Sequence, residues 1–104
     1  MATYDVYPNP DTEDRAATPY LLDVQNNFLE IDTRVVVPLH DASRFGLALV
    51  RDLNPELVVQ DKILIMNTAA IGAIPAADLR RPLANLASQN AAIQNALDTL
   101  FGGF

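Results

Sequence analysis

The chain has 104 residues, enough for one domain and too few for two, so a single domain spanning residues 1–104 is expected. Half of its residues are hydrophobic and 19% are charged, a composition typical of a folded protein. The formal net charge of −6 argues against direct binding of nucleic acid, because phosphate contacts depend on clustered Lys and Arg. The lack of cysteine excludes disulfides, thiolate nucleophiles and cysteine-rich zinc sites.

Neither a secretory signal nor a membrane-spanning stretch is expected. The N-terminus begins Met1-Ala2-Thr3-Tyr4-Asp5, with no basic start and no apolar run behind it. The most apolar stretch, residues 69–77, is far shorter than the roughly 20 residues that a spanning helix needs. We therefore expect a cytoplasmic protein that does not associate with a membrane.

The first half of the chain predicts short strands separated by turns. Alternating apolar and polar side chains predict a strand over residues 4–7, which Pro8-Asn9-Pro10 ends before a polar loop. Residues 19–25 and 34–39 predict a second and a third strand, the latter because of its consecutive valines. Pro38 predicts that the third strand ends, bulges or lies on an edge there.

The middle of the chain predicts a β-hairpin. Residues 57–59 and 62–67 form its two strands, and Gln60-Asp61 forms its turn. Before it, residues 41–54 have an irregular pattern that predicts a short helix or a loop. After it, residues 73–76 predict a short, weak strand.

The last quarter predicts a helix that begins near Pro82, a residue suited to the first turn. Gly102-Gly103 ends this helix, because glycine adopts left-handed or extended backbone at little cost. The helical spacing places one apolar stripe against the β core, interrupted only by Asn90. Its members are Leu83, Leu86, Asn90, Ile93, Leu97, Leu100 and Phe101.

Two pairs of apolar residues are less easily assigned to the core. Phe101 and Phe104 stand at the glycine-rich end of the chain, where an aromatic ring either tucks onto the surface or anchors in a partner's pocket. Phe28-Leu29 follows Asn26-Asn27 in an apparent turn, and the same two alternatives apply to it. Both alternatives stay open from the residues alone.

The sequence predicts no active site, metal site or cofactor. His40 and Asp41 resemble a base and its orienting carboxylate, but no nucleophile accompanies them, and a polar residue at a strand end is the better interpretation. The acidic pairs Glu13-Asp14 and Glu30 with Asp32 lie in predicted turns, so we expect solvated carboxylates rather than a divalent-ion site.

Three segments together resemble the CcdB family of toxins from toxin–antitoxin systems. They are Leu22-Asp23-Val24-Gln25, the Val-Val-Pro-Leu of residues 34–39, and Asn95-Ala96-Leu97 running to Phe101-Gly102-Gly103-Phe104. The similarity extends from Val6-Tyr7 to Phe104. Each segment alone is a weak signal, but their order and spacing are fairly specific.

The resemblance implies a mainly β fold with a C-terminal α-helix, a small SH3-like or CcdB-like barrel that assembles as a homodimer. Toxins of this family, associated with plasmid maintenance in bacteria, bind the A subunit of DNA gyrase and trap its cleaved-DNA complex. They do so without catalysis of their own. A CcdA-type antitoxin neutralises the toxin, and the pair represses its own operon through the antitoxin. The resemblance therefore implies a topoisomerase poison rather than an enzyme.

The gyrase-contacting positions of the family fall on two segments of this chain. They match Asn26, Phe28, Leu29, Asn95, Asp98, Phe101, Gly102, Gly103 and Phe104. The best-known members end in Trp-Gly-Ile, and their tryptophan stacks on a gyrase arginine. Here Gly102 stands at the tryptophan position and Phe104 at the isoleucine position, and the chain has no tryptophan. We hypothesise that Phe104 supplies the missing aromatic contact.

Two alternatives come from other functional classes. One is a degenerate or retargeted toxin that only binds antitoxin. The other is a MazF-like endoribonuclease, which shares this fold but needs basic or acid–base groups gathered in an RNA groove. The seven basic residues are scattered here, with Arg80-Arg81 the only adjacent pair, which disfavours the nuclease.

Overall fold

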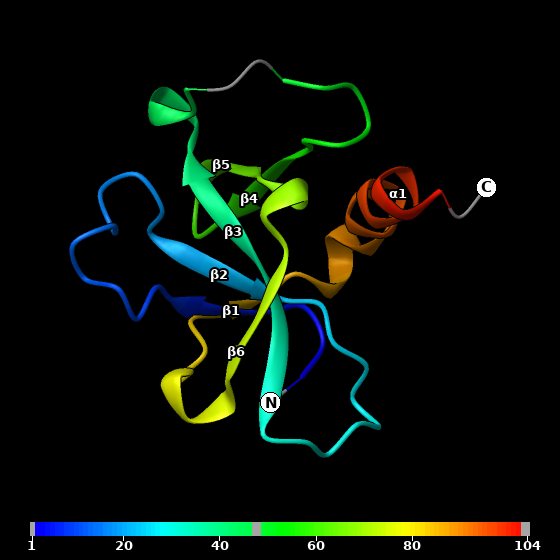
Figure 1. Cartoon of the computed structure of the whole chain (residues 1–104). Coiled ribbons are helices and arrows are strands. Elements are labelled where there is room, and N and C mark those ends of the chain that lie inside the picture. The colour runs from blue at the N-terminus through cyan, green and yellow to red at the C-terminus, as the bar shows by residue number, and fades with distance from the viewer. Residues whose placement is uncertain (1, 47–48, 103–104) are drawn as a thin grey trace.

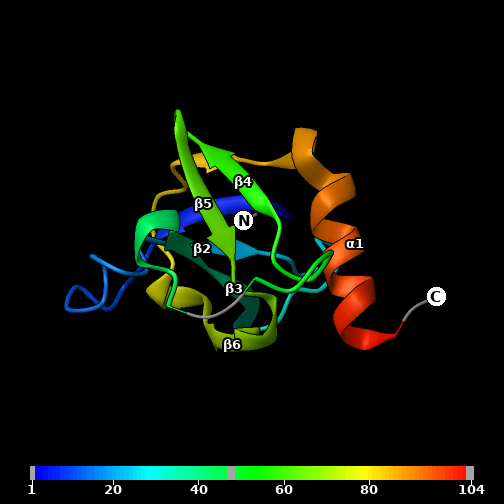
Figure 2. The same ribbon diagram turned by 90° about the horizontal axis from the view of Figure 1, so that it is seen from above.

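Short strands curl into a nearly closed barrel in the computed structural model, which describes residues 2–46 and 49–102, and a helix packs against the side of the barrel (Figures 1 and 2). The strands are β1 (Asp5–Pro8), β2 (Tyr20–Asp23), β3 (Thr33–Asp41), β4 (Glu56–Val59), β5 (Lys62–Met66), β6 (Gly72–Pro75) and β7 (Ala84–Asn85). The α-helix is α1 (Asn90–Phe101), and single 3-10 turns lie at Ala42–Arg44, Thr68–Ala70, Ala76–Asp78 and Ala87–Gln89. The expected mainly β fold with a C-terminal helix is confirmed.

The strands are antiparallel, and their order is β4-β5-β3-β2-β1-β7, with β6 also paired to β3. The long strand β3 has two partners along one edge: residues 33–36 pair with β6, and residues 39–41 pair with β5. Pro38 lies between these two stretches, so its missing N–H falls where the strand changes partners. This arrangement is the physical reason that a proline is tolerated within the nine-residue strand.

A side chain joins the two ends of the strand order. Gln89, just after β7, accepts a hydrogen bond from Val58 N through Oε1 (2.9 Å) and donates Nε2 to Val58 O (2.8 Å). Gln60 Nε2 also donates to Leu83 O (3.2 Å). The primary amide of Gln89 thus pairs with β4 as a neighbouring strand would, which helps to close the barrel where backbone pairing is lacking.

The core has two parts, one on each face of the β1-β2-β3 sheet. Alternation along each strand sends one set of side chains into the barrel and the next set to the outer face. The larger cluster fills the barrel, and Ile93 and Ala96 of α1 cover it. The smaller cluster comprises Tyr7, Leu21, Val36 and Leu79. Because both faces are covered, these strands are apolar almost continuously.

The prediction that the helix begins near Pro82 is wrong, since α1 starts at Asn90. The backbone before it follows the free edge of β1: Leu83 N donates to Val6 O (2.7 Å), and Leu86 N donates to Tyr4 O (2.9 Å). Asn85 Oδ1 then accepts from Ala87 N (2.9 Å) and turns the chain toward the helix. Hydrogen bonding to an otherwise open edge therefore overrides the helical spacing of the apolar residues.

The other elements lie close to their predicted positions. The hairpin is confirmed, and Gln60 and Asp61 both have positive φ (49° and 67°), as a tight two-residue turn requires. Residues 41–54 contain the 3-10 turn Ala42–Arg44, while positions 47 and 48 lie outside the described residues. Gly102 ends α1 with φ 68°, as predicted. Within the described part of the chain, the helices are too short or too polar to cross a bilayer.

Candidate functional site

The segment after β2 forms a tight turn that carries Phe28 at its tip. Asn26 Oδ1 accepts from Phe28 N (2.8 Å), and Asn26 O accepts from Leu29 N (3.2 Å). An asparagine side chain that bonds the backbone two residues on is a usual way to fix such a turn. Phe28 is 91% exposed and Leu29 is 51% exposed. The turn thus presents two large apolar side chains to solvent, next to the carboxamide of Asn26.

Buried polar contacts anchor the start of this turn. Asp23 accepts two hydrogen bonds from Arg34, from Nε to Oδ2 (2.7 Å) and from Nη2 to Oδ1 (2.8 Å), and a third from Gln25 N (2.9 Å). Gln25 Oε1 accepts from Val35 N (2.9 Å) and so ties residue 25 to β3. The chain therefore leaves β2 from a fixed point, one residue before Asn26.

The second predicted segment is the exposed face and the end of α1. Ile93 and Ala96 are buried against the barrel, so Asn95, Asp98 and Phe101 project to the solvent side of the helix. Phe101 is 68% exposed. Gly102 N donates to Asp98 O and closes the last turn of the helix. Gly103 and Phe104 lie outside the described residues.

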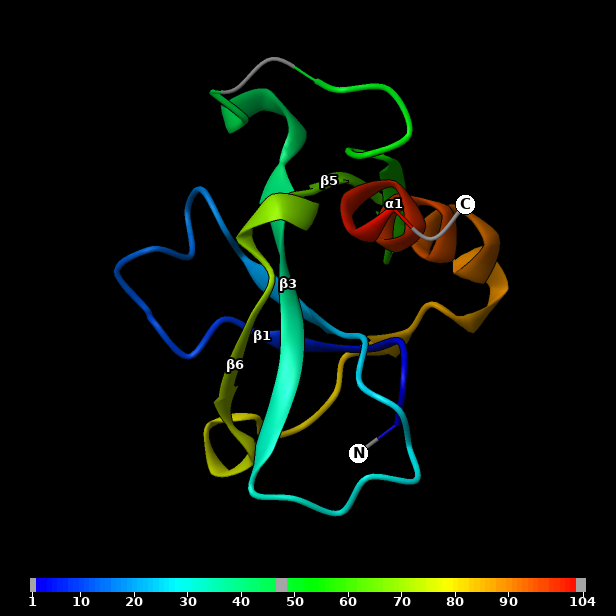
Figure 3. The same cartoon turned by 45° about the vertical axis from the view of Figure 1, so that its right-hand side comes forward.

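The two segments lie on the same side of the barrel, although about seventy positions separate them in the chain. Figure 1 shows α1 at the upper right and the loop after β2 at the lower right, and Figure 3, turned by 45°, shows the same relation. Phe28 and Phe101 are the two most exposed large apolar residues among those described. The described positions of the two segments therefore lie on one side of the molecule, and each segment carries an exposed aromatic ring.

The side chains of His40 and Asp41 bond different partners. His40 Nδ1 lies 3.1 Å from Thr18 Oγ1, and His40 Nε2 lies 3.1 Å from Asn67 Nδ2. Asp41 instead accepts from Ser43, from Oγ at 2.6 Å and from N at 2.9 Å, and these bonds lower the pKa of Asp41. His40 lies near the end of β3, as the structural interpretation of the sequence predicted.

The acidic turn residues face solvent. Glu13, Asp14, Glu30 and Asp32 are all exposed. Residues 2–46 and 49–102 contain no group of three or more His, Cys, Asp or Glu that could hold a metal ion.

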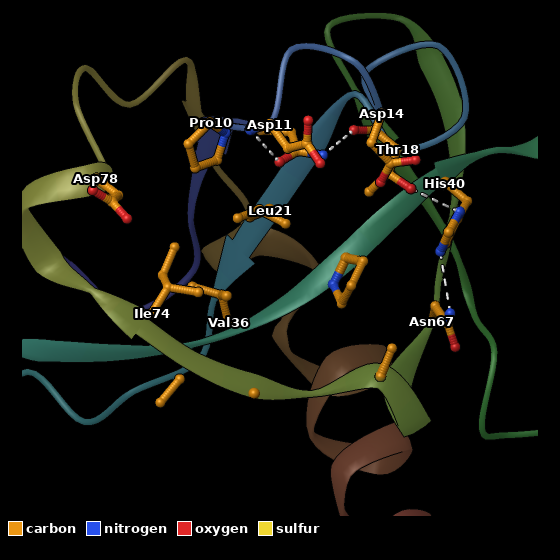
Figure 4. A pocket seen from close by; sticks show the side chains of 15 residues that line it. Pro10, Asp11, Asp14, Thr18, Leu21, Val36, His40, Asn67, Ile74 and Asp78 are labelled. Atoms are coloured by element: carbon orange, nitrogen blue, oxygen red, sulfur yellow. Dashed lines mark hydrogen bonds between the residues drawn. The ribbon is translucent and has the colours of Figure 1, made fainter.

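A groove of about 660 Å³, which the sequence did not predict, lies beside β6 (Figure 4). Leu21, Val36 and Ile74 supply apolar surface, while Asp11, Asp14 and Asp78 supply carboxylates. His40, Thr18 and Asn67 lie at one end, joined by the hydrogen bonds described above. The lining comes from several separate segments, so no local pattern could reveal it. The described residues predicted to bind gyrase lie outside this groove.

A second missed feature is an exposed apolar patch on the β4-β5 hairpin. Val58 and Ile63 are cross-strand partners and are each about half exposed, and Leu83 lies nearby, since its carbonyl accepts from Gln60. The alternation of these strands could have indicated the outward side of Val58 and Ile63. The contact with Leu83 needed the tertiary structure.

A small barrel with a packed C-terminal helix and an exposed aromatic side defines a compact binding module. A family comparison gives the class: the family model described as CcdB protein matches residues 3–103, almost the whole chain. The protein therefore belongs to the CcdB family, toxins of toxin–antitoxin systems whose members are gyrase poisons. A search of curated proteins found no match.

Proposed function

We propose that this protein binds the A subunit of DNA gyrase and traps the complex in which gyrase holds cleaved DNA. The contact surface comprises Asn26, Phe28, Leu29, Asn95, Asp98, Phe101, Gly102, Gly103 and Phe104. The observation that carries the proposal is the exposure of Phe28 and Phe101 on one side of the barrel, within a CcdB family chain. An aromatic ring left in water becomes favourable when a partner's pocket buries it.

The mechanism needs only binding. A protein that binds gyrase more tightly when the DNA is cleaved than when it is intact shifts the enzyme's equilibrium toward the cleaved state. The size of the shift is set by the difference between the two affinities. The net charge of −6 suits a partner surface made of protein rather than DNA. The toxin acts in the cytoplasm, where gyrase works.

The partners are a second copy of the chain and a CcdA-type antitoxin. The homodimer doubles a small binding surface and matches a two-fold symmetric target. The antitoxin neutralises the toxin, and the complex represses its operon through DNA contacts made by the antitoxin. Because the antitoxin makes the DNA contacts in this proposal, the toxin needs no basic surface, which agrees with its acidic composition.

Expression of the chain without an antitoxin tests the function. Growth arrest with accumulation of cleaved DNA bound to gyrase is the expected result. Arrest with RNA decay and intact DNA would instead support a MazF-like endoribonuclease. Unimpaired growth would support a degenerate toxin that only binds antitoxin.

Phe104 has a specific role in this proposal, because the chain lacks the tryptophan found at the C-terminus of well-known family members. Loss of an aromatic anchor costs about 2 kcal/mol or more, which is about thirtyfold in affinity. Removal of Phe104 should therefore weaken binding to the gyrase A subunit. Unchanged affinity of the shortened chain would show that Phe104 is not the substitute aromatic.

A further inference from the structure

We propose that Thr3 and Tyr4 are positioning residues that hold the loop after β2 and helix α1 in one fixed arrangement, and so set the shape of the gyrase-binding surface. The two residues are neighbours in the chain, and each bonds one of the two segments. This inference rests on the proposed function, since it assigns residues that act through that surface.

Thr3 holds the loop. Its backbone N donates to Asn27 Oδ1 (2.5 Å), beside Phe28 in the chain. Its hydroxyl lies 2.6 Å from Gln25 O and 2.9 Å from Asn27 Oδ1 and donates its single hydrogen to one of these acceptors at a time. Thr3 therefore contacts the loop on both sides of Asn26, the residue that forms the turn.

Tyr4 holds the helix. Its ring packs against the barrel core, and its hydroxyl accepts a hydrogen bond from Gln94 Nε2 (2.9 Å). Gln94 lies on the exposed face of α1, one residue before Asn95 and one helical turn before Asp98. The phenol thus reaches the same face of α1 that carries the second group of predicted contacts.

The backbone of these two residues is itself fixed. Tyr4 N donates to Asp23 O (2.7 Å), and Tyr4 O accepts from Leu86 N (2.9 Å). Asn85 Nδ2 donates to Thr3 O (3.1 Å). Contacts from both β2 and the β7 region therefore hold Thr3 and Tyr4, so neither can follow a movement of the loop or of the helix alone.

Tyr4 has φ 73°, in the left-handed region that a bulky side chain rarely adopts. Such a conformation persists where the surrounding structure imposes it, and it is found at functional sites more often than elsewhere. Here it allows the backbone N and O of Tyr4 to bond different segments while the ring reaches the helix. The strained residue thus stands at the point where the two halves of the surface are joined.

A surface fixed before binding loses less freedom when a partner docks than a surface whose two halves move independently. Tyr4→Phe, which removes only the hydroxyl, should therefore weaken binding of the gyrase A subunit threefold to tenfold. Thr3→Val, similar in shape to threonine, should have an effect of the same size. Tyr20→Phe is the matched control, because Tyr20 lies at the far end of β2 and should bind as the unaltered protein does.

A double-mutant cycle separates positioning from general damage. Tyr4→Phe is combined with Phe101→Ala, and affinities are measured at a temperature where circular dichroism shows every variant folded. If the Tyr4 hydroxyl acts by holding the helix, its removal should reduce the affinity for the gyrase A subunit less when the Phe101 ring is already absent. The double variant should therefore bind about as weakly as Phe101→Ala alone. Strictly additive losses, or unchanged binding by Tyr4→Phe, would overturn the positioning role.

The outcomes also separate this inference from the function on which it rests. If the unaltered protein fails to bind gyrase, both the proposed function and the positioning role are contradicted. If the unaltered protein binds and Phe28→Ala weakens it while Tyr4→Phe and Thr3→Val do not, only the positioning role is overturned. Nuclear magnetic resonance of the free protein adds a check, since Thr3→Val should increase the mobility of the Phe28 amide.

Discussion

Asp23 and Arg34 form a bidentate ion pair that is almost fully removed from water, with Arg34 Nε 2.7 Å from Asp23 Oδ2 and Nη2 2.8 Å from Oδ1. The pair joins the end of β2 to β3, and Asp23 lies three residues before Asn26, where the turn begins. Removal of one partner from such a pair leaves a charge buried alone. Loss of either partner should therefore destabilise both the barrel and the base of the loop.

Arg34→Met should lower the free energy of unfolding by about 3–5 kcal/mol, because Asp23 loses its partner inside the protein. Urea denaturation measures the change. Arg80→Met, at an exposed arginine, is the control and should alter stability by less than about 0.5 kcal/mol. Replacement of both partners by apolar residues, Asp23→Leu with Arg34→Met, should recover part of the loss. A loss below about 1 kcal/mol for Arg34→Met would contradict this account of the pair.

Gln89→Ala should open the seam between β4 and the β7 region, because it removes both hydrogen bonds to the backbone of Val58. We expect a loss of about 1–2 kcal/mol, from two bonds of about 1 kcal/mol or less each. Hydrogen exchange should show faster exchange of the Val58 amide, while Ser88→Ala, at the exposed neighbouring position, should leave it unchanged. Unchanged protection of Val58 in Gln89→Ala would contradict the closing role of Gln89.

Tyr7 makes the stability sensitive to alkaline pH. Burial, followed by the negative charges of Asp5 and Asp23, raises the pKa of Tyr7 to about 12, above its ordinary value of 10.0. The unfolded chain therefore loses this proton at a lower pH than the folded chain does. The stabilising contribution of Tyr7 is complete below pH 10 and is lost between pH 10 and about 12, by roughly 3 kcal/mol in all.

Urea denaturation across this range should show the loss, and Tyr7→Phe should remove that part of the pH dependence. A parallel alkaline decline in both proteins would contradict the assignment.

Local chemistry sufficed to predict most of the strands but not the start of the helix. The three valines of β3 and the turn residues Gln60 and Asp61 act on their immediate neighbours, so sequence patterns revealed them. The segment from Pro82 to Gln89 has helical spacing, yet its backbone bonds the edge of β1, about eighty residues earlier in the chain. A pairing between such distant segments leaves no local signal.

The candidate surface was predictable only where its residues stand out within a short stretch of the sequence. Phe28 was noted as a large apolar residue in an apparent turn, and the residues alone left open whether it tucks onto the surface or contacts a partner. Its exposed fraction of 91% shows that it does not tuck onto the surface of the free chain. The sequence could not show that Thr3 and Tyr4 bond both halves of the surface, since these contacts join the N-terminus to residues as distant as Gln94. The groove beside β6 was missed because its lining residues come from several separate segments.

The protein should be a dimer at micromolar concentration, with the two C-terminal helices near the symmetry axis. Sedimentation equilibrium should then give twice the chain mass of 11.3 kDa. A chain that sediments at 11.3 kDa under these conditions would contradict the homodimer.

A cleavage assay with purified gyrase and circular DNA tests the central claim most directly. The unaltered protein should increase linear DNA released after protein digestion, and Phe28→Ala should require about thirtyfold more protein for the same effect. Ile63→Ala is the control, because Ile63 is also a large apolar residue and is 54% exposed, but it lies on the β4-β5 hairpin, and this variant should act as the unaltered protein does. Failure of the unaltered protein to increase cleaved DNA, or equal activity of Phe28→Ala and Ile63→Ala, would contradict gyrase poisoning through this surface.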